Sequence, residues 1–322
     1  MAGTCRICGS GTHRWLAGLY DDRYGYPGSF DMEACDACGH RQIDASFDAA
    51  ALRVLYTQYY PRGSFDLEGW RAAAPTGGIG SWLAGEGSSA FRWVPRDVRV
   101  LDIGCGFGES LGYHKARGCE VHGVDADENI RRVAECHGFN VQVGLFEAER
   151  YAADYFDIVT LDQVIEHAVD PVGMLRGVAR VLKPGGAAIL STPNPDGWGA
   201  KRYGRRWINW HVPYHLHQFN ARSMGEAARR AGFEVVRRLT RTHSEWLFYQ
   251  WLHLGADPSP GTPHAFWSPK GERTAAFERA HARALSRRRL RLHQAVTRWF
   301  DALGRGDNQL FFLRRPLAQG AR

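Results

Sequence analysis

Several features that define other classes of protein are missing from this chain of 322 residues. No apolar run reaches the roughly 18 residues of a membrane-spanning helix. The first residues, 1–13, are polar and contain cysteines, so they do not resemble a signal peptide, and we expect a cytoplasmic protein. A composition of 44% hydrophobic and 12% aromatic residues excludes a disordered chain and indicates a sizeable folded core.

Two common phosphate-binding motifs are also absent. The glycine-rich segment 100–108 has glycines at 104, 106 and 108, whereas a dinucleotide fingerprint places its third glycine three residues after the second. The Lys followed by Ser or Thr of a phosphate-binding loop is missing. Instead Asp102 precedes the glycines, and a carboxylate suits a cationic amino-acid group better than a pyrophosphate. The apolar strand predicted at 99–103 therefore leads to a site for a nucleotide-type cofactor with a cationic part.

This segment resembles motif I of the class I S-adenosylmethionine (SAM) dependent methyltransferases, and the similarity extends from about Arg96 to Phe233. Further predicted strands follow in that family's order, at 120–124, 140–143, 156–161 and 187–191. The resemblance implies an α/β, Rossmann-like sheet of seven strands whose last strand is antiparallel. It also implies SAM as the cofactor.

The resemblance places the cofactor contacts at the carboxyl ends of these strands. Asp102 and Gly104 would hold the methionine end of SAM, and Asp125 would accept hydrogen bonds from both ribose hydroxyls. Leu145 and Phe146 would lie beside the adenine. The complete implied set is Asp102, Gly104, Cys105, Gly106, Gly108, Asp125, Ala126, Leu145, Phe146, Asp162 and Gln163.

Four of the seven cysteines form two Cys-x-x-Cys pairs, at Cys5, Cys8, Cys35 and Cys38. A glycine follows each pair, so each is expected to be a tight turn that directs backbone N–H groups at thiolates. Four sulfurs satisfy tetrahedral Zn²⁺ and leave no open position, which predicts structural zinc. Two disulfides or free thiols are the alternatives, and a reducing compartment disfavours disulfides. The other cysteines, Cys105, Cys119 and Cys136, are expected to be small core residues, with Cys105 also part of the cofactor turn.

These anchors divide the chain into five parts. Residues 1–45 form the zinc module, and 46–95 begin with a helical pattern and become rich in glycine and aromatics, as in a cofactor lid or a segment packed on the sheet. Residues 96–244 form the SAM-binding core. The strands expected at 233–239 and 309–314 are separated by a helical, arginine-rich insertion at 245–307, and 308–322 form the final strand and tail.

Aromatic residues and histidines are concentrated at 205–219, after the strand predicted at 187–191. Ligands of open α/β sheets bind beyond the carboxyl ends of the strands, so we expect this loop to cover the acceptor site. Sugar C-methyltransferases carry a Tyr-His-x-His cluster that Tyr214, His215 and His217 resemble.

A methyl acceptor needs a free lone pair, and a neutral imidazole is a suitable base for exposing one. The predicted catalytic residues are His215 first and His217 second, then His167, with Tyr214 beside them. Each histidine has a structural alternative, since it could cap the following helix or bond the loop, and Glu166-His167 is a common structural feature of the family. The reaction would be an in-line displacement in which alignment and exclusion of water matter most.

Positive charge is concentrated in the insertion, where residues 270–300 carry nine cationic and two acidic side chains. This excess equals the net charge of the whole chain, +7, which argues against a protein that coats nucleic acid. The segment would bind an anionic acceptor such as a nucleotide sugar or glycolipid, an acidic membrane surface or RNA, or it is a solvated helix face. Its apolar positions, among them Phe277, Leu292 and Trp299, predict packing on the body or a partner, including a homodimer through 245–307.

Three functional hypotheses follow. The favoured one is methyl transfer to a hydroxyl of a sugar, glycolipid or natural product. O-methylation is preferred because the sugar C-methyltransferases carry a further C-terminal domain that this sequence lacks, while C- and N-methylation remain alternatives. The second is an RNA methyltransferase, although the Asn-Pro-Pro-aromatic sequence used on base amines does not follow the strand at 156–161. The third is a cofactor-binding protein without catalysis.

Overall fold

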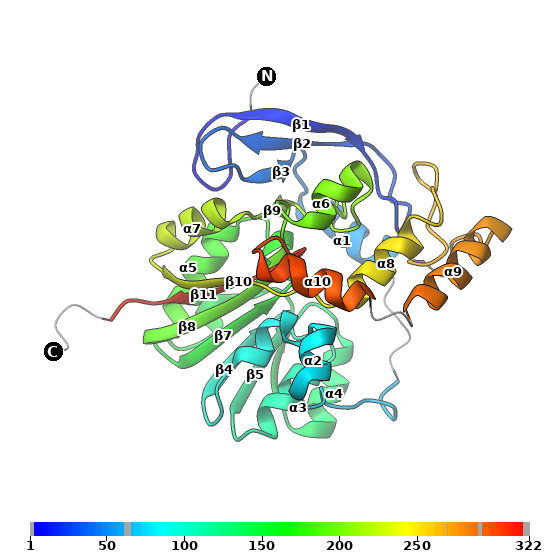
Figure 1. Cartoon of the computed structure of the whole chain (residues 1–322). Helices are drawn as coiled ribbons and strands as arrows, with labels where there is room; N and C mark the ends of the chain where they lie inside the picture. The colour runs from blue at the N-terminus through cyan, green and yellow to red at the C-terminus, as the bar shows by residue number, and fades with distance from the viewer. Residues whose placement is uncertain (1–2, 61–65, 269, 289–291, 318–322) are drawn as a thin grey trace.

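A seven-stranded sheet forms the centre of the computed structural model, which describes residues 3–60, 66–268, 270–288 and 292–317 (Figure 1). Its strand order is β10-β11-β8-β7-β4-β5-β6, and the last strand in sequence, β11, is antiparallel to both of its neighbours. The strands are β4 (Arg99–Ile103), β5 (Glu120–Asp125), β6 (Asn140–Val143), β7 (Phe156–Asp162), β8 (Leu182–Pro193), β10 (Glu234–Thr240) and β11 (Asn308–Arg314). The predicted α/β fold class is confirmed.

The two faces of the sheet have separate cores because alternate side chains of a strand point to opposite faces. Val100 of β4 packs with α3, α4 and η3, while the adjacent Leu101 packs with α5 and α7. Both residues are fully buried, as expected for a central parallel strand covered on both sides. The covering elements are η3 (Ala90–Trp93), α3 (Glu109–Lys115), α4 (Asn129–His137), α5 (Pro171–Val181) and α7 (Ala221–Arg230).

The N-terminal residues form a second, four-stranded sheet that lies at the top of Figure 1. Its strands are β1 (Thr12–Leu19), β2 (Phe30–Cys35), β3 (Arg41–Ile43) and β9 (His217–Gln218). β9 belongs to the histidine-rich loop and pairs with β3, so the loop completes the sheet of the N-terminal module. This pairing fixes the module to the carboxyl-end side of the central sheet.

Short helices connect these parts. Residues 47–60, predicted to be helical, contain α1 (Ala49–Val54) and a π-helical turn, η1 (Leu55–Tyr59). Further along the chain are α2 (Gly78–Ala84), η2 (Glu86–Ser88), η4 (Ala148–Arg150), η5 (Ile165–His167), α6 (Trp198–Tyr203) and η6 (Gly204–Arg206).

The insertion lies between β10 and β11 and consists of α8 (Glu245–His253), α9 (Ala275–Arg288) and α10 (Leu292–Ala302). The helical insertion expected over 245–307 therefore contains these three described helices, and the cationic positions 289 and 291 lie outside the described residues. Phe277 is buried, as expected, whereas Leu292 and Trp299 are largely exposed, so of the two expected alternatives they do not pack on the body. Arg298 is buried, which corrects its expected place on a charged face.

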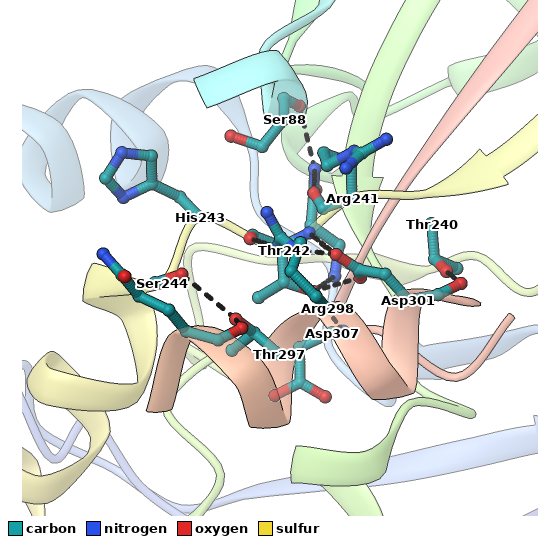
Figure 2. Close-up of polar contacts among 12 residues, drawn as sticks. Ser88, Thr240, Arg241, Thr242, His243, Ser244, Thr297, Arg298, Asp301 and Asp307 are labelled. Carbon is teal, nitrogen blue, oxygen red and sulfur yellow. Dashed lines mark hydrogen bonds and ion pairs between the residues drawn. The ribbon is translucent and has the colours of Figure 1, made fainter. Parts of the chain in front are cut away.

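A buried polar network joins α10 to the segment before β4 (Figure 2). Arg298 donates to the main-chain oxygens of Trp82 and Thr242, and Ser244 contacts both Leu83 O and Thr297 Oγ1 at 3.0 Å. Gly85 ends α2 with a φ of 78°, and a Cβ there would lie 2.1 Å from Thr242 O. Only glycine fits this close approach. The hydrogen bonds of Arg298 and Ser244 hold α2 and α10 to the same loop.

Candidate functional site

The glycine-rich turn after β4 is a cradle that only glycine can form. Gly104, Gly106 and Gly108 have φ values of 75°, 56° and 80°, in the left-handed region that disfavours other residues. A Cβ on Gly106 would meet nothing within 4 Å, so the turn is open at that point. A Cβ on Gly104 would lie 2.4 Å from Cγ2 of Val164, which places the turn against the segment that follows β7.

Asp102 lies beneath this turn and supports it. The hydroxyls of Ser110 and Thr160 donate to its two carboxylate oxygens, and the residue is 3% exposed. Burial raises the pKa of Asp102 to about 7, although both hydrogen bonds lower it. Both of its oxygens are thus engaged inside the protein.

Asp125 at the end of β5 faces the same turn. Its Oδ2 accepts a hydrogen bond of 2.8 Å from Gly106 N and its Oδ1 accepts one from Asp127 N. Of the other cofactor positions expected here, Ala126 and Leu145 are exposed, Phe146 is half-buried against Tyr151, and Cys105 is buried under the turn. The contacts of these positions with a cofactor stay predictions.

The end of β7 lies on the other side of β4 from β5 and Asp125. Asp162 accepts hydrogen bonds from Ala90 N and the Ser191 hydroxyl, and Gln163 donates to Ser191 Oγ and Asn308 Oδ1. Gln163 has a φ of 57°, an uncommon conformation for a residue with a side chain. The segment before β4 also reaches the turn, because the Trp70 indole donates to Phe107 O at 2.8 Å. Its role as a lid stays a prediction.

Three residues beyond Gln163, a carboxylate and two imidazoles converge. Glu166, His167 and His215 each present a ligand atom, and these atoms lie within 4.8 Å of one another. The Thr192 hydroxyl at the end of β8 donates to Glu166 Oε2, while Glu166 Oε1 is buried with no hydrogen-bond partner among the described residues. A carboxylate with two imidazoles can hold a divalent cation or move a proton.

Hydrogen bonds fix the tautomer of these two histidines. Nδ1 of His215 lies 2.9 Å from Asn209 O, and Nδ1 of His167 lies 3.0 Å from Tyr214 O. A carbonyl can only accept, so it favours a proton on Nδ1 and a lone pair on Nε2 of both rings. The Tyr56 hydroxyl also lies 3.0 Å from Nδ1 of His167, and its oxygen then accepts a second bond from that proton. Burial lowers the pKa of His167 to about 4 and that of His215 well below its usual value, whereas burial raises the pKa of Glu166 to about 8. Burial thus favours the uncharged form of all three groups.

Aromatic side chains from three parts of the chain surround this cluster. Tyr56 and Tyr60 come from the helical segment before the sheet, Tyr214 from the histidine-rich loop, and Tyr24 from the β1–β2 connection of the N-terminal module. Tyr24 lies edge-on to Tyr60 and Tyr214, with ring centroids 5.2 and 5.3 Å apart. The Tyr214 hydroxyl is buried without a partner among the described residues. The result is an aromatic wall that contains one such hydroxyl.

The sequence did not predict all of these residues. Tyr24, Tyr56 and Tyr60 lie more than 150 positions before Tyr214, and no short motif connects them. Glu166 was interpreted as structural only. The structure brings His167, Tyr214 and His215 together but gives His217 a different environment, where its Nδ1 lies 2.9 Å from Nε2 of His40 beside β3.

The four N-terminal cysteines form a second candidate metal centre. Their sulfurs lie within 4.8 Å of one another, with 3.7 Å between Cys5 and Cys38 and 3.4 Å between Cys8 and Cys35. A tetrahedral ion with bonds of about 2.3 Å needs sulfurs about 3.8 Å apart, so the set fits zinc. Ile7 N donates to Cys5 Sγ and Cys38 N to Cys35 Sγ, as the predicted turns require. Cys105 and Cys119 are buried, but Cys136 is exposed on α4, which corrects its expected core position.

Comparison with known proteins identifies the family of this chain. A family model described as a methyltransferase domain matches residues 71–238, just over half of the chain. The chain belongs to the methyltransferase domain family. It is a SAM-dependent methyltransferase.

Curated relatives match part of this methyltransferase. A ubiquinone biosynthesis O-methyltransferase of Thiobacillus denitrificans is 34% identical over 165 residues, which are 45% of this chain and 70% of the relative. An enzyme of the same name from Pseudomonas aeruginosa is 35% identical over 150 residues, 42% of this chain and 65% of the relative. Among solved structures, the [4+2]-cyclase SpnF has 18% identity and a TM-score of 0.46, covering 74% of this chain and 82% of SpnF.

Proposed function

We propose that this methyltransferase moves a methyl group to a hydroxyl of a small-molecule acceptor, such as a sugar, a glycolipid or another natural product. The observation that carries the proposal is the cluster of Glu166, His167 and His215, which begins two residues after Val164, the residue that lies against the glycine turn. The names of the curated relatives support transfer to oxygen on a small molecule. The aromatic wall of Tyr24, Tyr56, Tyr60 and Tyr214 suits an acceptor with a ring that can pack against it.

The cofactor contributes a methyl group activated by a sulfonium. The protein must then orient the acceptor, exclude water and accept the hydroxyl proton. His215 Nε2 is the proposed base, because its Nδ1 proton is held by Asn209 O and the lone pair faces the cluster. His167 has the same tautomer and is the second candidate. Tyr214 positions His167 through its main-chain oxygen.

The cofactor roles proposed for this chain follow the family pattern with one change. Asp125 holds the ribose, Leu145 and Phe146 flank the adenine, and Gly104, Asp162 and Gln163 surround the methionine end. Asp102 acts through the turn, because Ser110 and Thr160 already engage both of its oxygens.

We assign the four cysteines a structural zinc ion that holds the β1–β2 hairpin in place. The connection between these strands carries Tyr24 to the aromatic wall and Arg23 to Ile208 O in the histidine-rich loop. Asp21 braces this connection by accepting hydrogen bonds from the backbone N–H groups of Arg23, Tyr24 and Tyr26. In this proposal the zinc module shapes the acceptor site without touching the reacting atoms.

The test is to incubate the protein with methyl-labelled SAM and a host-cell extract, and then to separate RNA, lipid and small-molecule fractions. Label in the lipid or small-molecule fraction is expected, and label in RNA would overturn the proposal. His215→Ala should reduce turnover at least about 100-fold, the lower range for general-base catalysis, with unchanged SAM affinity. His281→Ala on α9 is the control. Normal turnover of the His215 variant would remove it as the base.

A further inference from the structure

An exposed apolar surface lies on α2 and α10, outside the methyltransferase site. Ile79 and Trp82 on α2 are 78% and 52% exposed, and Leu292, Trp299 and Leu303 on or just after α10 are 69%, 64% and 51% exposed. The spacing of 292, 299 and 303 places these three side chains on one face of the helix. Large apolar side chains gathered in this way mark an interaction surface. These five residues form the α2–α10 surface.

The two helices present this surface as one unit. Arg298, the neighbour of Trp299, donates to the main-chain oxygen of Trp82 at 2.7 Å, and Thr297 Oγ1 lies 3.0 Å from the Ser244 hydroxyl (Figure 2). The contact to residue 82 uses its main-chain oxygen, so replacing the indole ring leaves this hydrogen bond in place. The exposed rings can therefore be changed without breaking the network beneath them.

Cationic side chains border the α2–α10 surface. Arg241 lies 6.0 Å from the Trp82 ring centroid, and Arg305 is exposed just beyond α10. Lys201 and Arg202 are exposed on α6, which is fixed beside α10 by stacking of Trp198 on Phe300 at 4.9 Å. Across the described ranges of the chain, none of these four cations forms an ion pair with a carboxylate. The nearby Asp301 and Asp307 are engaged by the polar network and by Gly199 N.

We propose that the α2–α10 surface docks on an anionic lipid bilayer. Trp and Leu side chains enter the boundary between headgroups and acyl chains, and surrounding cations meet the lipid phosphates. No helix among the described residues is long and apolar enough to cross a membrane, so docking would be peripheral. A second copy of the chain fits less well, because a two-fold interface centred on this surface would bring like charges together. The inference does not depend on the identity of the acceptor.

The experiment is co-sedimentation of the full chain with vesicles of equal parts phosphatidylglycerol and phosphatidylcholine, and with vesicles of phosphatidylcholine alone. Binding is expected for the anionic vesicles, decreasing with salt. The double variant Trp82→Ser, Trp299→Ser should lower partitioning at least about tenfold, and Lys201→Ala or Arg202→Ala about fivefold each. Val235→Ser, Val236→Ser is the matched control, since both valines are exposed on β10.

Calorimetric SAM affinity of the double variant reports whether the methyltransferase core is intact. Wild-type chain that binds SAM but sediments with neither vesicle would overturn the inference while leaving the proposed function in place. Equal binding by the double variant and wild type would also overturn it. Sedimentation velocity that finds a wild-type dimer abolished by the double variant would assign the surface to a second copy instead.

Discussion

Arg298 and Asp301 form an ion pair that is almost completely withdrawn from solvent. The distance from Nη2 to Oδ2 is 2.7 Å, and each side chain is 5% exposed. Both groups have further partners, since Arg298 donates to two main-chain oxygens and Asp301 accepts from the backbone N–H and hydroxyl of Thr242. The pair thus connects the insertion to the segment before β4, although these lie more than 200 positions apart.

Removing one member of this pair should destabilise the protein strongly. Arg298→Leu is expected to lower the free energy of unfolding by about 3–5 kcal/mol, because it leaves the Asp301 carboxylate buried and unpaired. Chemical denaturation measures this change. The matched control is Arg273→Ala, which removes a pair to Glu278 with side chains 69% and 49% exposed and should cost under about 1 kcal/mol. Similar effects from both variants would mean that the buried pair has no special role.

Asp125 is expected to bind the cofactor ribose as well as Gly106 N. Asp125→Ala should weaken SAM binding by about 1–3 kcal/mol, the range for hydrogen bonds to a charged group. Titration calorimetry gives the affinity directly, and Glu128→Ala, an exposed acidic residue close by, is the control. An unchanged affinity would remove Asp125 from the ribose role.

Metal analysis should find about one zinc ion per chain, and Cys35→Ser should abolish it. Loss of the metal should release the hairpin that carries Tyr24, so turnover of the acceptor should fall at least about tenfold, the size of effect expected when support around a site is lost. SAM affinity should change little, because the glycine turn lies in the other sheet. Cys136→Ser changes an exposed cysteine outside the cluster and serves as the control. Metal-free protein with full turnover would favour free thiols without a structural role.

Glu166 should make the protein less stable as the pH rises. Burial raises its folded-state pKa from 4.5 to about 8, so its contribution to stability is fully present below pH 4.5 and is lost as the pH rises through 8. Within this window the loss is at most about 1.4 kcal/mol per pH unit. Glu166→Gln cannot ionise, so relative to wild type it should become more stable from pH 5 to 9. Denaturation curves that keep a constant difference between the two proteins would contradict the raised pKa.

Local chemistry was sufficient for much of this protein. The apolar strands and the glycines at 104, 106 and 108 specify the central sheet and its turn, because a buried parallel strand and a left-handed backbone each restrict the residue type. The Cys-x-x-Cys pairs likewise predict a four-sulfur cluster from spacing alone. Each of these features depends on neighbours in the sequence.

The tertiary structure decided what depends on distant residues. The sequence could not show that β9 completes the sheet of the N-terminal module, nor that this brings Tyr24 against Tyr214. From the sequence, Arg298 is expected to be a surface cation. Whether a charge is buried depends on a partner and on main-chain oxygens from other elements, which the sequence does not show. The sequence by itself determined the cofactor turn and the cysteine cluster. Only packing decided which histidines meet, which carboxylate joins them and which tryptophans remain exposed, since each of these depends on segments that touch only after folding.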